Sequence, residues 1–399
     1  MIQRFMKFKI SFVYPSIILF YFCLLLPYLE PQIFKTAGYE TYDRLYAVMK
    51  LISAVVVIVL YLYINKLHFS KYVLTMAVMQ FWILASTIIN NGSLTRFAGP
   101  AIISVVILML GELIAKQNWL KFLELLRNFL MIFLIINFLS QLINYFVFGK
   151  ANLTTFLGID NRWIYFYLPL IFITLIVSQL KNNNIDLLSV IIIVICIGSL
   201  LLAHSVGAVL AMISFVIMYG LYNYFPYTAV KYYGIYCLFN FFLVKGYILQ
   251  SFSYVIRDVM SKDVTLSGRT YLWKTVVDVL VNKSFFGMGV QSSIYDCNYF
   301  FEQSGNVIGC FVNHPHNYFL NIAYHGGIPA LILFIYLYFC TIKKVDSIKD
   351  KSIKRIAVSC LSAFLVASLV DTLDFSLFYL FIPIITYALS NYNNNLLGE

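Results

Sequence analysis

The sequence contains little charge for its length. Only 11% of its 399 residues are charged, whereas 61% are hydrophobic, and the mean hydropathy is +0.84. This balance excludes an ordinary soluble globular domain and indicates an integral membrane protein in contact with lipid. The sequence also contains no basic stripe interleaved with exposed aromatic side chains, so we expect no nucleic-acid partner.

Internal repeats and low-complexity linkers are absent as well. Without either, we expect residues 1–399 to form a single membrane domain. The first apolar segment lacks the small-x-small cleavage site of a signal peptide and is longer than a signal-peptide core. We therefore expect this segment to remain in the mature protein.

Long apolar runs recur along almost the whole chain. A bilayer core is crossed by about 20 apolar residues in helical conformation. We count twelve such runs, at 10–29, 45–64, 72–90, 98–115, 122–148, 163–180, 186–203, 205–225, 230–249, 317–341, 356–372 and 374–391. The pattern predicts an all-α polytopic membrane protein with about twelve transmembrane helices. The division between the seventh and eighth runs is the weakest, because only His204 and Ser205 mark it.

Lys and Arg are distributed unevenly around these runs. Twelve crossings place both termini on one side, which holds 15 of these residues against 6 in the short loops of the other side. The richer side has Arg4, Lys7, Lys9, Lys66, Lys71, Lys116, Lys121, Lys181, Lys231, Lys343, Lys344, Lys349, Lys351, Lys354 and Arg355; the poorer has Lys35, Arg44, Lys50, Arg96, Lys150 and Arg162. Because short cytoplasmic loops carry the positive excess, we expect both termini in the cytoplasm.

One connection is much longer than the others. Residues 250–316 separate the ninth and tenth runs on the side opposite the termini. A loop this long is usually functional or disordered, and the aromatic content of this one argues against disorder. Apolar residues at helical spacing predict a helix over 270–282, with Ser267 as its N-cap and Gly287 and Gly289 after its end. We expect this helix to lie in the membrane interface, because it is too short to span.

Cysteine is sparse outside the apolar runs. Of the seven cysteines, only Cys297 and Cys310 lie outside them, and both are in the long loop. Oxidation is permitted on the non-cytoplasmic side, so these two could form a disulfide. Two free thiols are the alternative, because spacing alone does not show that their Cα atoms are close enough to bond.

Two histidines flank a proline where the tenth run begins, in His314-Pro315-His316-Asn317. A residue before proline avoids the helical region, so we expect an extended pair with both rings on the same side. Asn317 can cap the following helix, whose N-terminal amides favour an anion. Two alternatives are histidines bonded to backbone carbonyls and half of a zinc site. Zinc needs three or four ligands, and no nearby Cys or His supplies the rest, so we expect no metal.

Three arginines are expected on the same side as the histidines. Arg269 begins the predicted loop helix, Arg162 lies at the outer end of the sixth run, and Arg96 lies between the third and fourth. Guanidinium groups bind phosphate oxygens in a bidentate manner, so this set suits a diphosphate. The simpler interpretations are an ion pair of Arg269 with Asp263 or Asp278, and headgroup anchors for the other two.

Two carboxylates lie in the turn between the last two runs. Asp371 and Asp374 are flanked on both sides by apolar sequence. Acidic residues in such surroundings are costly and often functional. Ordinary turn residues are the alternative.

Four short motifs follow one another in a fixed order. They are Ser267-Gly268-Arg269-Thr270-Tyr271-Leu272-Trp273, Phe286-Gly287-Met288-Gly289, His314-Pro315-His316-Asn317 and Gly326-Gly327. In this order, with about twelve spans and a large outer loop before the tenth, the sequence resembles the O-antigen ligase and polymerase superfamily. The motifs cover about residues 267–330, and only the topology matches elsewhere.

The resemblance implies a metal-independent, inverting glycosyltransferase without a cofactor, in the bacterial inner membrane. Its expected partners are an undecaprenyl-diphosphate-linked oligosaccharide and membrane lipid, with a chain-length regulator as a further candidate. Arg269 would hold the donor diphosphate, and His316, assisted by His314, would accept a proton from the acceptor hydroxyl. Asp371 matches an acidic residue that ligases carry near the end of the chain. The expected substrate-binding set comprises Arg162, Arg96, Asn317, Tyr271, Trp273, His204 and Asp371.

One feature departs from the superfamily pattern. Many ligases carry a Ser/Thr-Arg pair on an earlier span, whereas this sequence has Ser205-Val206, so that Arg162 or His204 would have to substitute. The departure favours a polymerase, which joins lipid-linked repeats into O-antigen or capsule, over a ligase, which transfers glycan to lipid A-core. A transporter or flippase for lipid-linked sugars is the alternative of another class, and the lack of an inverted repeat argues against it.

Overall fold

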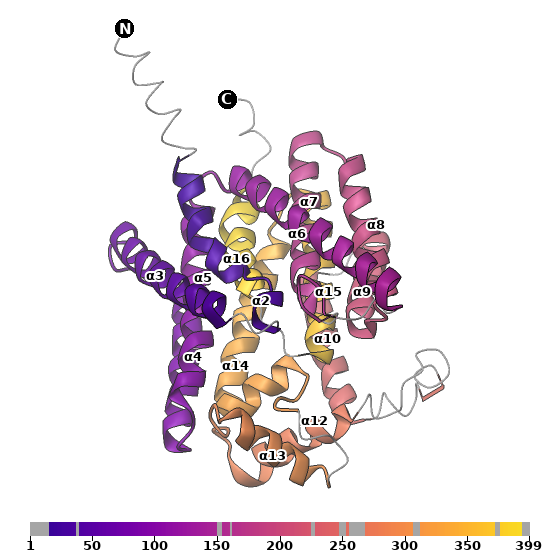
Figure 1. Cartoon of the computed structure of the whole chain (residues 1–399). Coiled ribbons are helices and arrows are strands. Elements are labelled where there is room, and N and C mark those ends of the chain that lie inside the picture. The colour runs from indigo at the N-terminus through magenta and orange to yellow at the C-terminus, as the bar shows by residue number, and fades with distance from the viewer. Residues whose placement is uncertain are drawn as a thin grey trace.

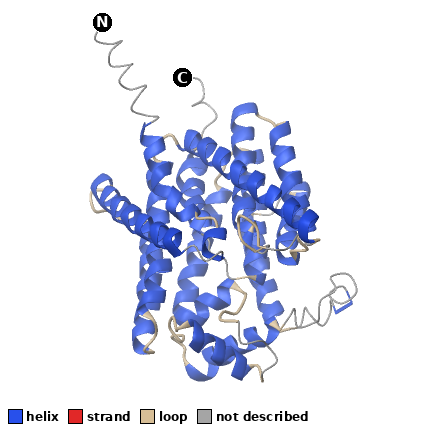
Figure 2. Ribbon diagram, viewed as in Figure 1, coloured by secondary structure: helices blue, strands red, loops and turns tan. Residues whose placement is uncertain are grey.

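The computed structural model describes residues 16–36, 40–149, 154–159, 162–224, 228–246, 253–254, 268–305, 312–371 and 376–392. Within these ranges the protein is a bundle of helices joined by turns (Figures 1 and 2). The one isolated β-bridge there joins Thr155 to Gly158. The architecture confirms the predicted all-α polytopic membrane protein.

Twelve apolar helices of the described chain coincide with the twelve predicted runs. Seven are long and apolar enough to cross a membrane: α3 (Glu40–Ile64), α4 (Lys71–Ile89), α5 (Leu94–Ala115), α6 (Trp119–Phe148), α7 (Ile164–Asn182), α14 (Tyr318–Asp346) and α15 (Lys351–Val370). Five are shorter: Ser16–Leu29, which ends in η1 (Leu26–Leu29), α8 (Leu187–Leu202), α9 (Val206–Leu221), α10 (Ala229–Val244) and Leu377–Asn391. The last comprises α16 (Ser376–Pro383), η5 (Ile384–Ala388) and η6 (Leu389–Asn391), and a single turn, α2 (Ile33–Thr36), precedes α3.

Short polar side chains set where the helices begin. The hydroxyl of Ser70 accepts from the Val73 amide at the start of α4, and that of Ser93 accepts from the Arg96 amide at the start of α5. Such caps satisfy amides that the first helical turn leaves unpaired. Gly149 ends α6 with a φ of 66°, a left-handed conformation that glycine adopts without strain.

The long helices differ in how much protein surrounds them. In α7, 78% of the most apolar window is buried inside the protein, compared with 22% in α3. Figure 1 shows α3 lying obliquely at one edge of the bundle. We infer that α7 belongs to the protein core, whereas α3 presents most of its surface to lipid.

The long loop covers one end of the bundle with α12 (Arg269–Asp278), η4 (Val279–Lys283) and α13 (Ser293–Gln303), at the bottom of Figure 1. The predicted loop helix is thus confirmed, although its N-cap is Gly268, with a φ of 83°. The predicted N-cap, Ser267, lies outside the described residues. Leu272 and Val276, on the apolar face of α12, are buried inside the protein, so protein covers the face that we expected in the membrane interface.

Candidate active site

The two histidines precede α14 and lie side by side. Their ring centroids are 4.2 Å apart, as the shared side predicted from sequence requires. The extended backbone was a wrong prediction for His316, which has a φ of 47°. This left-handed conformation reverses the chain between Pro315 and Asn317, and non-glycine residues held in it are enriched at functional sites.

Asp371 lies next to His316, although the two residues are 55 positions apart in the chain. It follows the end of α15, and its Oδ1 lies 3.2 Å from Nδ1 of His316. The side chains of His316 and Asp371 are 26% and 18% exposed, respectively, so a ligand can reach both. Burial raises the pKa of Asp371, but the hydrogen bond from His316 and the charges of both histidines and Arg269 outweigh it and hold the pKa below its usual value. Asp371 is therefore a carboxylate at neutral pH.

His314 stays neutral in this environment. Burial is the largest cause and the charge of His316 the next, and together they lower the pKa of His314 to about 4. Asp371 opposes this shift, while the charges of Arg162 and Arg96 add to it. The charges of both arginines thus act on His314.

Arg269 is the first residue of α12, and its positive charge interacts with the carboxylate of Asp371. Burial lowers the pKa of its guanidinium, and the negative charge of Asp371 partly restores it. Among the described residues, no side chain accepts a hydrogen bond from this guanidinium. Asp278 lies nine residues further along α12, about 14 Å away at the helical rise, which is too far for the ion pair that we considered. Asp263 lies outside the described residues.

Two predicted binding residues hold the histidines in place. Asn317 caps α14 by accepting from the Leu320 amide at 3.1 Å, which confirms the predicted cap. Its amide also donates to Asn240 at 3.0 Å. Trp273 is fully buried, and its indole N–H donates to the carbonyl of Pro315 at 2.9 Å. Trp273 thus supports the turn between the histidines rather than facing a substrate.

The remaining predicted residues lie in different surroundings. Tyr271 is half-buried on α12, and Arg162 is exposed just before α7. His204 is exposed in the turn between α8 and α9, with a φ of 55°, and the contacts of the described residues do not connect it to the histidine pair. Cys310 lies outside the described residues, so its disulfide with Cys297 stays a prediction.

Arg96 is engaged by the protein itself. Its Nη1 donates to Oδ2 of Asp296 at 2.5 Å and to the carbonyl of Gln291 at 2.7 Å. Neither Asp296 nor its helix α13 was predicted from the sequence. An acidic residue within the aromatic segment Tyr295–Phe301 was the signal that could have indicated a buried ion pair.

A metal ligand set is present among these side chains. One ligand atom each from His314, His316 and Asp371 lie within 4.8 Å of one another. We expected no metal from the sequence because no third ligand lies near the histidines in the chain. The fold supplies a third ligand, Asp371, from 55 residues further along the chain. Two histidines and a carboxylate can bind a divalent metal. The positive charges of Arg269, Arg162 and Arg96 act against a cation here.

Comparisons with known proteins show what these residues are similar to. A family model described as O-Antigen ligase matches residues 191–335, the part of the chain with Arg269 and both histidines. This match and the relatives described next support the resemblance to the O-antigen ligase and polymerase superfamily. Asp371 lies beyond the part that the family model matches.

Proteins of three Rickettsia species match a segment of 106 residues. Those of R. conorii and R. prowazekii are 26% identical and that of R. typhi 27% identical, and each is described as a "Putative polysaccharide ligase". Each match covers 26% of this chain and 26% of the relative, so the chain matches about a quarter of the length of these superfamily relatives. No solved structure matches significantly.

Proposed function

We propose that the chain is a polysaccharide polymerase that joins undecaprenyl-diphosphate-linked oligosaccharide repeats into O-antigen or capsule. The observation that carries this proposal is the meeting of Arg269, Asp371 and the histidine pair at the N-terminus of α14. A cation, a carboxylate and two imidazoles at a helix N-terminus suit a reaction that releases an anion and a proton.

The reaction is a single displacement at the anomeric carbon of the donor sugar. An acceptor hydroxyl oxygen attacks that carbon from the face opposite the diphosphate, the bond to the diphosphate oxygen breaks, and the configuration inverts. His316 takes the hydroxyl proton, and Asp371, hydrogen-bonded to its Nδ1, orients the ring and stabilises the imidazolium. Arg269 and Arg162 neutralise the leaving diphosphate, which needs no metal for this step.

Histidine and arginine have separate roles in this scheme. His314, held neutral, donates or accepts a hydrogen bond next to the reacting hydroxyl without adding charge. Asn317 and Trp273 fix the turn that carries both rings. Tyr271 is half-buried in the first turn of α12, two residues after Arg269, and we assign it to substrate binding on the resemblance alone.

The topology supports placement of the site on the outer face of the inner membrane. α14 runs from the histidines to Asp346 and α15 returns from Lys351. The basic run around this turn therefore lies at the end of the bundle remote from the site, as a cytoplasmic turn would. Both termini lie in the cytoplasm in this proposal.

A ligase that transfers glycan to lipid A-core is the second candidate, because the Rickettsia relatives are described as polysaccharide ligases. Ser205-Val206, with no arginine after the serine, argues against it. Purified protein incubated with defined lipid-linked repeats separates the two: a polymerase elongates them without any core acceptor. Activity only when lipid A-core is added would indicate a ligase, and no transfer in either case would refute both.

A further inference from the structure

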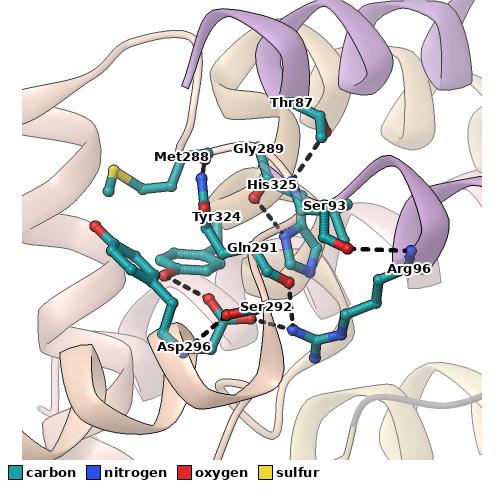
Figure 3. A network of polar contacts seen from close by, with 12 residues as sticks. Thr87, Ser93, Arg96, Met288, Gly289, Gln291, Ser292, Asp296, Tyr324 and His325 are labelled. Carbon is teal, nitrogen blue, oxygen red and sulfur yellow. Dashed lines mark hydrogen bonds and ion pairs between the residues drawn. The ribbon is translucent and has the colours of Figure 1, made fainter. Parts of the chain in front are cut away.

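A second group of polar contacts lies at the same end of the bundle (Figure 3). At its centre is Asp296 of α13, whose side chain is fully buried. Its Oδ2 accepts from Arg96 of α5 at 2.5 Å, and its Oδ1 accepts from the hydroxyl of Tyr324 of α14 at 3.0 Å. One buried carboxylate thus joins three helices that are far apart in the sequence.

The segment before α13 meets α14 at a break in that helix. Gly327 has non-helical angles, φ 66° and ψ −165°, which free the carbonyls of the preceding turn. The amide of Met288 donates to the Tyr324 carbonyl at 2.7 Å, and that of Gly289 donates to the His325 carbonyl at 3.0 Å. Nδ1 of His325 lies 3.0 Å from the carbonyl of Gly289. The loop therefore takes over hydrogen bonds that the helix loses at its kink.

The glycines of two sequence motifs make this contact possible. A Cβ on Gly287 would lie 2.5 Å from the backbone nitrogen of Gly327, and a Cβ on Gly289 would lie 2.5 Å from Cα of Thr87. Both glycines also have positive φ. A side chain at either position would push the loop away from α4 and α14.

These contacts fix a short arm that carries the histidines. The part of α14 before its kink runs from Tyr318 to Gly326, directly after His316. Asn317 caps its beginning. At its other end, the hydroxyl of Tyr324 donates to Asp296, and the indole N–H of Trp82 donates to the Gly326 carbonyl, each at 3.0 Å. The position of His316 relative to Asp371 therefore depends on both ends of the arm.

We propose that Asp296 is a positioning residue for glycosyl transfer, which it serves by joining Arg96 to Tyr324 and so fixing the arm of α14 that carries His316. In this role Arg96 pairs with Asp296 and does not bind the donor diphosphate. The predicted effect on catalysis rests on the proposed function. The docking of α13, in contrast, can be measured without any activity. Removal of one partner of a buried pair leaves an uncompensated charge, so the contact should be sensitive to substitution.

The kinetic test is a double-mutant cycle of Asp296→Asn and Arg96→Gln in the lipid-linked elongation assay. Each single variant should lower kcat on the order of 100-fold, as a misplacement of about 1 Å can, with KM for the donor unchanged. The double variant should be no slower than the slower single variant, because both remove the same contact. Glu302→Gln, an exposed acid on the same helix, is the matched control and should retain wild-type turnover.

A lysine variant separates the pair from a role in diphosphate binding. Arg96→Lys can still pair with Asp296 and should lose less than about tenfold in kcat. A raised donor KM, a severe loss with lysine, or multiplied losses in the double variant would mean that Arg96 binds the donor, and the proposal would be refuted.

Amide hydrogen exchange tests the docking itself. Asp296→Asn should raise exchange in residues 293–303 and 318–326 and leave α7 unchanged. Unchanged exchange in these two segments would overturn the proposal whatever the kinetics show. A wild-type protein that elongates no substrate would refute the proposed function instead, and exchange would still decide whether Asp296 holds the arm.

Discussion

Two polar regions of this bundle differ in their charge and in their exposure. The first joins α6, α7 and α8 to the turn at Thr155, and all its side chains are neutral and fully buried: Asn137, Gln141, Thr155, Tyr167 and Ser199. Asn137 donates to Tyr167 at 2.9 Å and accepts from Thr155 at 2.7 Å, and Ser199 donates to Gln141 at 2.7 Å. Such a satisfied network makes a particular packing of helices favourable.

The region around His316 is charged and partly open. Its carboxylate and imidazole are 18% and 26% exposed, its backbone has a positive φ, and the guanidinium of Arg269 lies close enough to act on Asp371. Charges that are buried yet reachable are costly for stability and are typical of sites that bind a charged ligand. From this difference we infer that the first region maintains the fold, whereas the second serves the proposed reaction. Substitutions should therefore affect stability in one region and turnover in the other.

The largest expected effect is that of His316→Asn on turnover. Asparagine tolerates the left-handed backbone of this position but cannot accept the proton, so kcat should fall on the order of 10²–10⁴-fold with an unchanged melting temperature. The measurement is elongation of lipid-linked repeats beside a thermal melt in detergent. His68→Asn, at an exposed histidine between α3 and α4, is the control. A lowered melting temperature with a normal kcat would mean that His316 stabilises the fold and is not needed for turnover.

Arg269→Lys should have the next largest effect. Lysine keeps the charge but loses the two parallel hydrogen bonds to the diphosphate, a loss worth about 2.7–4 kcal/mol, or roughly 10²–10³ in rate, by analogy with removal of an oxyanion-hole donor. A surface ion pair would be worth only about 0–1 kcal/mol and would tolerate lysine. Lys274→Gln removes an exposed charge from the same helix and should have no effect. Near-normal turnover by the lysine variant would remove Arg269 from the site.

Much of the scaffold of this site was predictable from the sequence, because it depends on local patterns. Apolar periodicity predicted the helices, including the one that begins with Arg269, and Asn317 was a recognisable cap. The contact of His316 with Asp371 was not predictable, since 55 residues separate them and only tertiary packing brings them together. The left-handed backbone of His316 was missed because the proline rule constrains only the residue before Pro315.

In the neutral network, Asn137→Leu should affect stability instead. The hydroxyls of Tyr167 and Thr155 keep Ser199 and the Gly158 carbonyl as partners. The buried amide of Leu157, however, loses the Asn137 oxygen that accepts from it at 2.8 Å, at about 1–3 kcal/mol for an unsatisfied group. We expect a lower melting temperature, with kcat retained in the fraction that remains folded. Asn128→Leu, at an exposed position of the same helix, is the control. If kcat fell while the melting temperature did not, the network would be part of the active site.

His314→Gln should change how stability depends on pH. The pKa of His314 is about 4 in the folded protein and about 6.5 when unfolded, so between these values the unfolded chain binds the extra proton. Wild-type stability therefore falls as the pH drops through this window, by on the order of 1–2 kcal/mol at pH 5. Glutamine removes this dependence, so melting temperatures of the two proteins should diverge between pH 7 and pH 5. Parallel curves would show that the fold does not lower the pKa of His314.

The smallest expected effect is that of metal removal, and it decides how the charged region is interpreted. His314, His316 and Asp371 could bind a divalent ion through atoms within 4.8 Å of one another. A bound metal would occupy nitrogen atoms that our mechanism needs for proton transfer, and it would lie close to the charge of Arg269, which repels it. In the proposed mechanism, arginine already supplies the positive charge that a metal would bring to the leaving diphosphate.

Elongation by protein purified without added metal should therefore continue unchanged in EDTA. The same protein should contain no stoichiometric zinc or manganese by elemental analysis, and Asp371→Asn should lower turnover equally with and without added Mn²⁺. Chelator-sensitive turnover that a divalent ion restores would instead make these three side chains a metal site. In that case Asp371 would be a metal ligand. The charged region would then bind a cation, and the neutral network would still bind none.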